Sequence, residues 1–365
     1  MLLRVLFFAA LLLLAIPAFA QESFVTDDDL LTIAQDYVSE DTPGMVIVVE
    51  DFGELYAAAA GAADLETGEP LQVDDYFRIG SITKPMVAAT VLSLVEDGDM
   101  SLDAPLADYL PDDIVANIAN AEAATVRETL QMTSGITDYL NTDAFLDAVE
   151  DAPDTYWTAA STLEFVYGMP ADFDAGTDYE YSNSNYNLVH IAIETVTGQP
   201  LVDVMDERVF APAEMDTCYL ETQATFAQNI VRGYEDNGDG TYFDMTEIND
   251  GVGMADGGVV CTAPDLVKFL PALVNGDIIG DEMLAEMLTP VDDGDGGQYG
   301  LGISYEDDPD DGLIIFHGGA TNGFEGMMMQ LVDEELTVVV LTNLVDNDNV
   351  TPALGDTVAL AFGDY

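Results

Sequence analysis

The sequence Gly-Ser-Ile-Thr-Lys-Pro at residues 80–85 places a serine three positions before a lysine, directly ahead of a helical pattern at residues 86–94. Proline is tolerated in a first helical turn, so Ser81 and Lys84 are predicted to share one face at a helix start. A serine hydroxyl needs a neighbour that draws off its proton, and a buried lysine with a lowered pKa suits that task. A solvated surface pair is the alternative, but the chain has only two lysines, Lys84 and Lys268. The scarcity of lysine favours a catalytic pair.

A second candidate element is Tyr181-Ser182-Asn183, which follows an acidic loop and precedes a helical pattern that ends at Gly198. A tyrosine beside a lysine ammonium is expected to ionise below its usual pKa of ~10 and to serve as general base and acid. Asn183 is placed to hydrogen-bond the lysine and a substrate amide. The alternative is that Ser182 and Asn183 cap the following helix. Both interpretations can hold at once.

A third candidate element lies at the end of the apolar run 313–316, where His317 is followed by Gly318, Gly319 and Ala320. This order places an ionisable group and two residues without side chains on a strand, where a substrate can lie against bare backbone. A histidine at a sheet edge with no catalytic task is the alternative.

These three elements, in this order, resemble the serine hydrolases of the β-lactamase and penicillin-binding protein family. The resemblance is to the branch with class C β-lactamases, D-alanyl-D-alanine carboxypeptidases and related esterases, which uses Ser-x-x-Lys, then Tyr-x-Asn, then Lys/His-x-Gly. Three further segments look like family segments and extend the resemblance over roughly residues 30–362: Phe-Arg-Ile-Gly at 77–80, Met-Thr-Ser-Gly-Ile at 132–136, and Gly-Gly-Val-Val-Cys-Thr-Ala-Pro-Asp-Leu at 257–266.

The resemblance implies a role for each side chain. Ser81 attacks a carbonyl carbon and forms an acyl-enzyme, while Lys84 and Tyr181 share the proton transfers, and the sequence does not decide which of them is the base. Asn183 orients Lys84 and the substrate. His317 tunes Tyr181 or touches the substrate. The motifs place only two basic side chains in the cleft: Lys84 and, if it is protonated, His317.

The backbone has implied roles as well. The N–H groups of Ser81 and Ala320 form an oxyanion hole, in which one donor contributes ~3 kcal/mol in comparable enzymes. Gly318 and Gly319 are the substrate-binding positions beside it. Two positions depart from the family pattern: Met132 stands where a histidine is usual, and is expected to concern packing away from the catalytic set. Gly318 stands where many members carry a threonine that holds a substrate carboxylate.

The hydrophobic pattern predicts an α+β fold, and the resemblance implies that this fold is β-lactamase-like. An antiparallel sheet is expected from both termini, with flanking helices and an inserted, mostly helical lobe. The α/β lobe is expected at about residues 25–80 and 297–365, and the helical lobe at about 81–296. The supporting patterns are a helix at 29–38, a hairpin from 45–49 and 55–60, strands at 313–316, 326–331 and 336–342, and a last helix at 352–361.

The composition restricts the partners. Seventy Asp and Glu face seven Lys and Arg, which gives a net charge of −63. Such a field repels nucleic acid and anionic lipid, so no nucleic-acid partner is expected. The scattered acids indicate a solvated coat that suits a saline habitat, where salt screens self-repulsion. With two histidines and no His-Glu-x-x-His segment, neither a metal nor a cofactor is expected. The Asp-rich stretch 236–240 is interpreted as a hairpin turn, because Thr246 stands where a calcium loop needs glutamate.

The first twenty residues have the layout of a secretory signal peptide, with Arg4, an apolar run at 5–16 and a small-residue cleavage position near Ala20. The sequence therefore predicts an exported protein, with no membrane span after cleavage. Cys218 and Cys261 are equally consistent with one disulfide and with separate buried thiols.

Three functions stay open from the sequence. The first is a secreted serine hydrolase that acts on small-molecule or peptide acyl substrates, whether esters, cell-wall peptides or β-lactams. The second is a catalytically inactive binding protein on the same fold. The third is an acidic structural or adhesive protein, against which the lack of internal repeats argues. The sequence leaves the oligomeric state open.

Overall fold

A computed structural model describes residues 24–39, 41–249, 253–294, 296–308 and 312–363. The predicted signal peptide lies outside the described residues. Within them, no helix combines the length and the apolar character that a membrane crossing requires.

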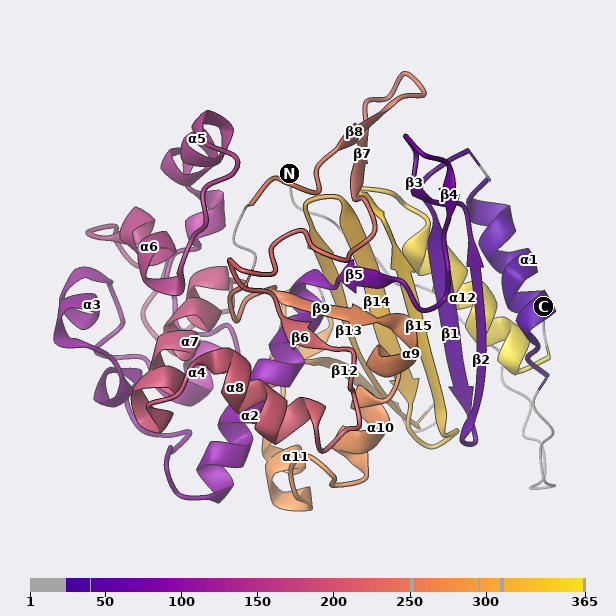
Figure 1. The fold of residues 1–365 in the computed structure, drawn as a ribbon. Helices are drawn as coiled ribbons and strands as arrows, with labels where there is room; N and C mark the ends of the chain where they lie inside the picture. The colour runs from indigo at the N-terminus through magenta and orange to yellow at the C-terminus, as the bar shows by residue number, and fades with distance from the viewer. Residues whose placement is uncertain (1–23, 40, 250–252, 295, 309–311, 364–365) are drawn as a thin grey trace.

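The centre of the molecule is an eight-stranded antiparallel sheet in the order β10-β11-β12-β13-β14-β15-β1-β2 (Figure 1). β1 lies between β15 and β2, so strands from the two ends of the chain are neighbours, as the sequence predicts. The strands are β1 (Met45–Asp51), β2 (Glu54–Ala60), β10 (Val291–Asp292), β11 (Gln298–Tyr299), β12 (Ser304–Asp308), β13 (Gly312–Thr321), β14 (Phe324–Leu331) and β15 (Leu336–Thr342).

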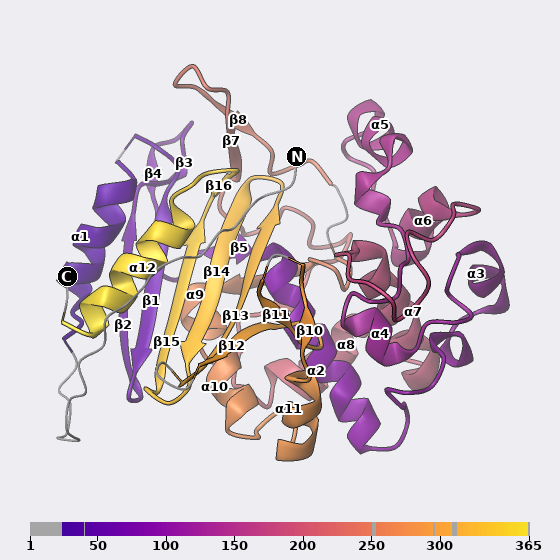
Figure 2. The same ribbon diagram turned by 180° about the vertical axis from the view of Figure 1, so that it is seen from behind.

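One face of the sheet is covered by the terminal helices α1 (Asp27–Tyr37) and α12 (Val350–Ala361), which Figure 2 shows packed side by side over β15, β1 and β2. Alternate strand residues point to opposite faces. Met45, Ile47 and Val49 therefore pack with α1 and α12, whereas Val46 and Val48 belong to the larger core on the other face. This two-sided burial explains the almost unbroken apolar run of β1.

The helices between the two halves of the sheet lie beyond its other face. They are α2 (Thr83–Glu96), α3 (Asp112–Asn117), α4 (Val126–Leu130), α5 (Asp143–Asp151), α6 (Ala159–Leu163), α7 (Asn183–Thr197), α8 (Leu201–Met205), α9 (Ala263–Leu266), α10 (Phe269–Val274) and α11 (Asp281–Met287). Of these, α9 and α10 contact the strands, whereas α3, α5 and α6 are well away from them (Figure 1). The helix α2 is buried along almost its whole length, and a short 3-10 turn, η1 (Gly80–Ile82), leads into it. This turn rests on β13, which fixes the start of α2 against the sheet.

Short strands occur between the helices, and the sequence patterns did not predict all of them. β5 (Tyr76–Arg78), β9 (Val259–Thr262) and β6 (Tyr219–Leu220) form a small sheet, and Cys218 and Cys261, which flank the β6–β9 pairing, form a disulfide. The structure thus settles the choice that the sequence left open between a disulfide and separate thiols. β3 (Ala62–Asp64) pairs with β4 (Glu69–Pro70), and β16 (Leu344–Val345) pairs with β7 (Tyr234–Asp236).

The Asp-rich stretch is a hairpin turn, as predicted, between β7 (Tyr234–Asp236) and β8 (Tyr242–Asp244). The Asp236 carboxylate accepts a hydrogen bond from the Gly238 N–H at 2.7 Å, and Asp239 accepts one from the Thr241 hydroxyl at 2.6 Å. The aspartates therefore stabilise the turn by accepting local hydrogen bonds.

Candidate active site

Lys84 is the centre of the candidate site, and the three hydrogens of its ammonium all have acceptors. Its Nζ donates to the Ser81 Oγ at 2.9 Å, to the Asn183 Oδ1 at 2.8 Å and to the Asp256 backbone oxygen at 2.5 Å. The Lys84 side chain is fully buried, whereas Ser81 is half-buried. The structure thus brings together the first two sequence elements and leaves the serine accessible.

Two tyrosine rings flank the ammonium. The Lys84 Nζ lies 4.8 Å from the ring centre of Tyr181 and 5.5 Å from that of Tyr186. The two hydroxyls have different partners: that of Tyr181 hydrogen-bonds Ser81, and that of Tyr186 donates to the Leu130 carbonyl at 3.1 Å. Tyr181 is therefore the tyrosine that shares the serine hydroxyl with Lys84.

Burial shifts the pKa values of these groups in opposite directions. Desolvation lowers the pKa of Lys84 to about 8, although the carboxylates of Asp256 and Asp138 oppose that change. Desolvation raises the pKa of Tyr181 well above its ordinary value, and the hydrogen bond with Ser81 only partly offsets this. The prediction that Tyr181 ionises more easily is therefore wrong, because the loss of water, together with the nearby Tyr179, Tyr186 and Asp138, raises its pKa by more than the Ser81 hydrogen bond lowers it. Tyr181 is a neutral phenol.

Asn183 is the first residue of α7, and Asp138 holds it in place. The Asp138 Oδ1 accepts from the Asn183 backbone N–H at 3.1 Å, and its Oδ2 accepts from the Asn183 side-chain amide at 3.0 Å. The amide oxygen is thereby turned toward Lys84. Ser182 occupies the N-cap position, but its side chain makes no capping hydrogen bond, so Asp138 supplies the acceptor for this helix end instead.

Asp256 is a second buried carboxyl beside Lys84. Besides the backbone bond to the ammonium, its carboxyl accepts from the Tyr139 hydroxyl at 2.7 Å. Burial raises the pKa of Asp256 to about 6, and the charge of Lys84 counteracts that rise. The sequence analysis missed both Asp138 and Asp256. Each of them lies within two residues of a family-like segment, 132–136 or 257–266, and this position could have identified them. The chain has 70 acidic residues, so these two did not stand out.

Met132 adjoins the second element rather than lying away from it. Its buried sulfur is 3.5 Å from the Ser182 backbone nitrogen and 3.5 Å from the Asn185 side-chain nitrogen. Its backbone carbonyl accepts from the Glu180 N–H at 3.0 Å. Met132 has a packing role, as expected. It packs against the segment that carries Tyr181 and Asn183, so it does not lie away from the catalytic set.

The third element lies on β13 beside the start of α2. β12 pairs with β13 only as far as Phe316, so the edge of β13 beyond that residue is open to η1. A Cβ on Gly80 would lie 2.8 Å from the Ala320 nitrogen, and one on Gly319 would lie 2.9 Å from the Ser81 nitrogen. Only glycines allow this approach, and Gly80 also has a φ of 53°. The backbones of Ser81 and Ala320 are thus adjacent.

His317 is buried next to Tyr299. Its Nε2 lies 3.2 Å from the Tyr299 hydroxyl, and its Nδ1 lies 2.6 Å from the Gly318 carbonyl oxygen. Burial, assisted by the charge of Lys84, lowers the pKa of His317 to about 3. His317 is therefore neutral near neutral pH, and the positive charge beside it is that of Lys84.

A side chain at position 318 would point away from Lys84. A Cβ on Gly318 would lie 3.3 Å from the Met327 methyl carbon, and Met327 packs with α1 and α12. The Gly318 backbone therefore lies at the open edge of the strand, and a side chain at this position would point toward Met327 instead.

Within the described ranges, no group of three or more His, Cys, Asp or Glu side chains is arranged to hold a metal ion. The arrangement offers an accessible hydroxyl, a buried amine of lowered pKa, a neutral phenol and two adjacent backbone N–H groups. These are the components of acyl transfer through a serine. The fold and this arrangement define the class of the protein as a serine hydrolase.

Comparisons with known proteins give the family. The Beta-lactamase family model matches residues 30–361, so the chain belongs to the β-lactamase family. The predictions of family, fold class and hydrolase are thereby confirmed.

Among curated relatives, penicillin-binding protein 4* of Bacillus subtilis is 26% identical over 85% of this chain and 70% of its own length. A D-aminopeptidase of Brucella anthropi is 29% identical over 89% of this chain and 59% of its own length. The chain thus spans less than two thirds of that aminopeptidase. A solved structure, the D-amino acid amidase from Ochrobactrum anthropi SV3 complexed with L-phenylalanine amide, has a TM-score of 0.77 at 25% identity, and the match covers 93% of this chain and 97% of the amidase.

Proposed function

We propose that this protein hydrolyses amides of amino acids or short peptides through an acyl-enzyme on Ser81. The observation that carries the proposal is the hydrogen bonding of Lys84, whose buried Nζ contacts the Ser81 Oγ and the Asn183 Oδ1 at once. The similarity to a D-aminopeptidase and a D-amino acid amidase supports amides as the substrate class. Activated esters are simpler assay substrates than amides. Their leaving group departs as a stable anion, whereas the nitrogen of an amide must receive a proton before it leaves.

In the proposed acylation, Lys84 is the base. Its lowered pKa makes the neutral amine accessible near neutral pH, whereas the raised pKa of Tyr181 keeps that residue protonated. As the Ser81 Oγ bonds to the substrate carbonyl carbon, its proton passes to the Lys84 Nζ. The negative charge that develops on the substrate oxygen is held by the N–H groups of Ser81 and Ala320.

The carbon–nitrogen bond of the amide then breaks. In the proposed path the leaving nitrogen receives the proton from Lys84 through the Tyr181 hydroxyl, which hydrogen-bonds Ser81. Lys84 is neutral again and can take a proton from the water that attacks the acyl-enzyme. As the bond between the acyl carbon and the Ser81 Oγ breaks, the Lys84 Nζ returns this proton to Oγ, which releases the carboxylic acid and restores both side chains; water is the only co-substrate that the cycle needs.

The surroundings of β13 favour substrates without a carboxylate next to the reacting carbonyl. His317 is neutral, so it adds no positive charge, and Gly318 offers only its backbone at the open edge of the strand. In addition, the chain carries a net charge of −63. Neutral or cationic acyl substrates, such as amino-acid amides, fit these conditions better than penicillins or peptides with a free C-terminal carboxylate.

The proposal is tested with a substrate panel measured on one preparation: the D and L forms of phenylalanine amide, p-nitrophenyl acetate, nitrocefin and a D-Ala-D-Ala peptide. We expect turnover of at least one amino-acid amide and of the ester, and loss of both in Ser81→Ala. Preferential turnover of nitrocefin or of the D-Ala-D-Ala peptide would contradict the proposed substrate class. A folded protein that turns over no compound and reacts with no serine-directed probe would instead be a binding protein on this fold.

We also propose that residues 1–20 direct export and are then removed. The support is the sequence alone, with Arg4, the apolar run at 5–16 and the small residues that end at Ala20. N-terminal sequencing of protein recovered outside the cytoplasm should begin at Gln21. A mature protein that keeps Met1 would contradict this proposal.

A further inference from the structure

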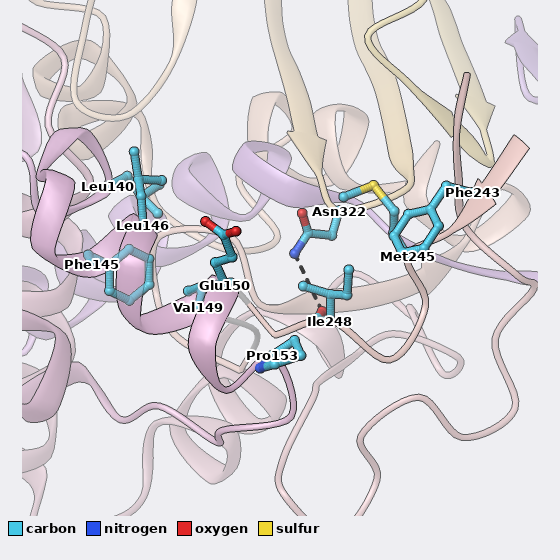
Figure 3. A pocket seen from close by; sticks show the side chains of 10 residues that line it. All are labelled: Leu140, Phe145, Leu146, Val149, Glu150, Pro153, Phe243, Met245, Ile248 and Asn322. Atoms are coloured by element: carbon cyan, nitrogen blue, oxygen red, sulfur yellow. Dashed lines mark hydrogen bonds between the residues drawn. The ribbon is translucent and has the colours of Figure 1, made fainter. Parts of the chain in front are cut away.

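An apolar pocket of about 470 Å³ opens between α5, the β7–β8 hairpin with the segment that follows it, and the end of β13. Figure 3 shows Leu146, Val149 and Glu150 of α5 facing Phe243 and Met245, with Asn322 and Ile248 between the two walls. The Asn322 side-chain amide donates to the Ile248 carbonyl at 3.4 Å, which joins the end of β13 to one wall. A pocket of this size suits one small ligand or one large side chain.

The pocket continues the candidate active site. Asn322 is two residues beyond Ala320, and consecutive Cα atoms are 3.8 Å apart, so the pocket starts within about 8 Å of the proposed oxyanion hole. On the opposite wall, Leu140 directly follows Tyr139, whose hydroxyl bonds the Asp256 carboxyl. A substrate bound at Ser81 and extended along β13 therefore ends next to the pocket.

The walls of the pocket are unusually apolar for an accessible surface. Leu146 and Phe243 belong to the few large hydrophobic side chains that are half exposed in the described parts of the chain. Beneath them, the Phe145 ring packs edge-on against the rings of Tyr139 and Phe165, at 4.9 and 5.2 Å. Apolar side chains above a rigid aromatic floor indicate a surface that a ligand completes.

The direction of the substrate follows from the path of the proton. The Tyr299 ring lies 5.8 Å from the Tyr179 ring and 6.0 Å from the His317 ring, so the segment that carries Tyr181 approaches β13 at His317. A leaving amine that takes its proton from Tyr181 must lie on that side. The acyl portion then extends the other way along β13, past Ala320 and toward Asn322.

We propose that this pocket binds the apolar side chain of the acyl portion and selects amides of large aliphatic or aromatic amino acids. The inference rests on the proposed function and deepens it. Of the ten described residues that line the pocket, only Glu150 is charged, and Figure 3 shows its carboxylate between the α5 wall and Asn322. A cationic or neutral acyl portion is thus accepted there, whereas a carboxylate is repelled.

The test compares two double variants that remove equally exposed side chains. Leu146→Ala/Phe243→Ala empties the pocket walls, and Phe52→Ala/Leu55→Ala makes the same change on the β1–β2 hairpin; their exposed fractions are 54% and 50% against 50% and 50%. The quantity measured is the ratio of kcat/KM for phenylalanine amide to kcat/KM for alanine amide. We expect the ratio to fall roughly tenfold in the pocket variant, the usual scale for lost apolar contacts, and to stay within about twofold in the control. An unchanged ratio in the pocket variant overturns the inference.

A binding measurement separates this inference from the proposed function. Ser81→Ala, alone and combined with each double variant, is titrated with phenylalanine amide and alanine amide in a calorimeter. If phenylalanine amide binds selectively and only the pocket variant loses this selectivity, the pocket assignment is supported. It is supported even if the wild-type protein turns over neither amide, because lack of turnover would contradict only the proposed hydrolysis. Equal affinity for the two amides in the Ser81→Ala protein overturns the pocket assignment even if hydrolysis is observed.

Discussion

The two sides of Ser81 are built differently. On one side, the buried Lys84 ammonium has three acceptors within 2.9 Å, and buried carboxyls and tyrosines surround it. On the other side, half-exposed Leu146 and Phe243 line a cavity that has one charged residue, Glu150, in its lining. Removal of a buried polar group leaves its partners without hydrogen bonds, whereas the loss of an exposed apolar side chain leaves only a gap. The polar side should therefore tolerate little change, and the apolar side should be adjustable.

The largest effect should come from Lys84→Ala, which removes the proposed base. We expect acylation to slow by at least ~100-fold, the usual scale for loss of a positioned proton carrier. The matched control is Lys268→Ala, because Lys268 is a partly exposed lysine that pairs with Asp265 at 2.5 Å on the protein surface. Stopped-flow labelling with a chromogenic ester gives the rates, and circular dichroism confirms that each variant is folded. Equal rates in the two variants would refute Lys84 as the base.

Next in size is the comparison of the two tyrosines beside Lys84. Tyr181→Phe removes the hydroxyl that bonds Ser81 and should cost roughly 100-fold in amide hydrolysis. Tyr186→Phe removes a hydroxyl that bonds the Leu130 carbonyl and the Tyr299 hydroxyl rather than Ser81, and should lower the melting temperature more than the rate. Steady-state kinetics on phenylalanine amide distinguish them. If Tyr181→Phe behaves as wild type, the proposed proton path fails while the nucleophile stands.

A smaller effect concerns substrate charge. At low salt a neutral ester should exceed its carboxylate analogue in kcat/KM by about tenfold, because the field of a chain with net charge −63 repels the anion. The gap should narrow in 1 M salt, where the Debye length is about 3 Å. A preference for the carboxylate analogue at low salt would show that local dipoles outweigh the acidic surface.

The smallest effect should be a change in the pH profile of Asp256→Asn. In the wild type, acylation should rise with pH through about 8, because Lys84 must lose its proton to act as a base. The Asp256 carboxylate stabilises the ammonium and raises the pKa of Lys84, so its removal should lower that pKa and move the rise to lower pH. The labelling rate at pH 7 should then increase a few-fold. A profile that shifts to higher pH would contradict the assigned coupling.

The polar side of Ser81 could be predicted from the sequence in large part, because its chemistry needs rare residues at short spacings. Ser81 and Lys84 share one helix turn, and Tyr181 and Asn183 straddle the start of another. Burial could not be predicted in the same way. It reverses the expected change in the pKa of Tyr181 and keeps His317 neutral, and both effects depend on neighbours distant in sequence.

The apolar side was not predicted, and the reason is physical. Its walls come from α5, from β8 with the segment that follows it, and from Asn322 beyond the end of β13, and no residue pattern shows that these distant segments meet. The sheet was easier to predict, since strands such as β1 and β15 are long apolar runs with clear turns. The β5–β9–β6 sheet was missed because its strands have three, four and two residues, too few to show a periodic pattern.

The central claim is that Ser81 becomes acylated, and intact-mass spectrometry after treatment with a fluorophosphonate probe tests it most directly. We predict that the wild-type protein gains the mass of one probe, that peptide mapping places it on Ser81, and that Ser81→Ala, which should fold with a stability within about 1 kcal/mol of the wild type, gains none. Modification of the Ser81→Ala protein to the same extent, or a folded wild-type protein that stays unmodified by both the fluorophosphonate and a chromogenic ester, would contradict the account.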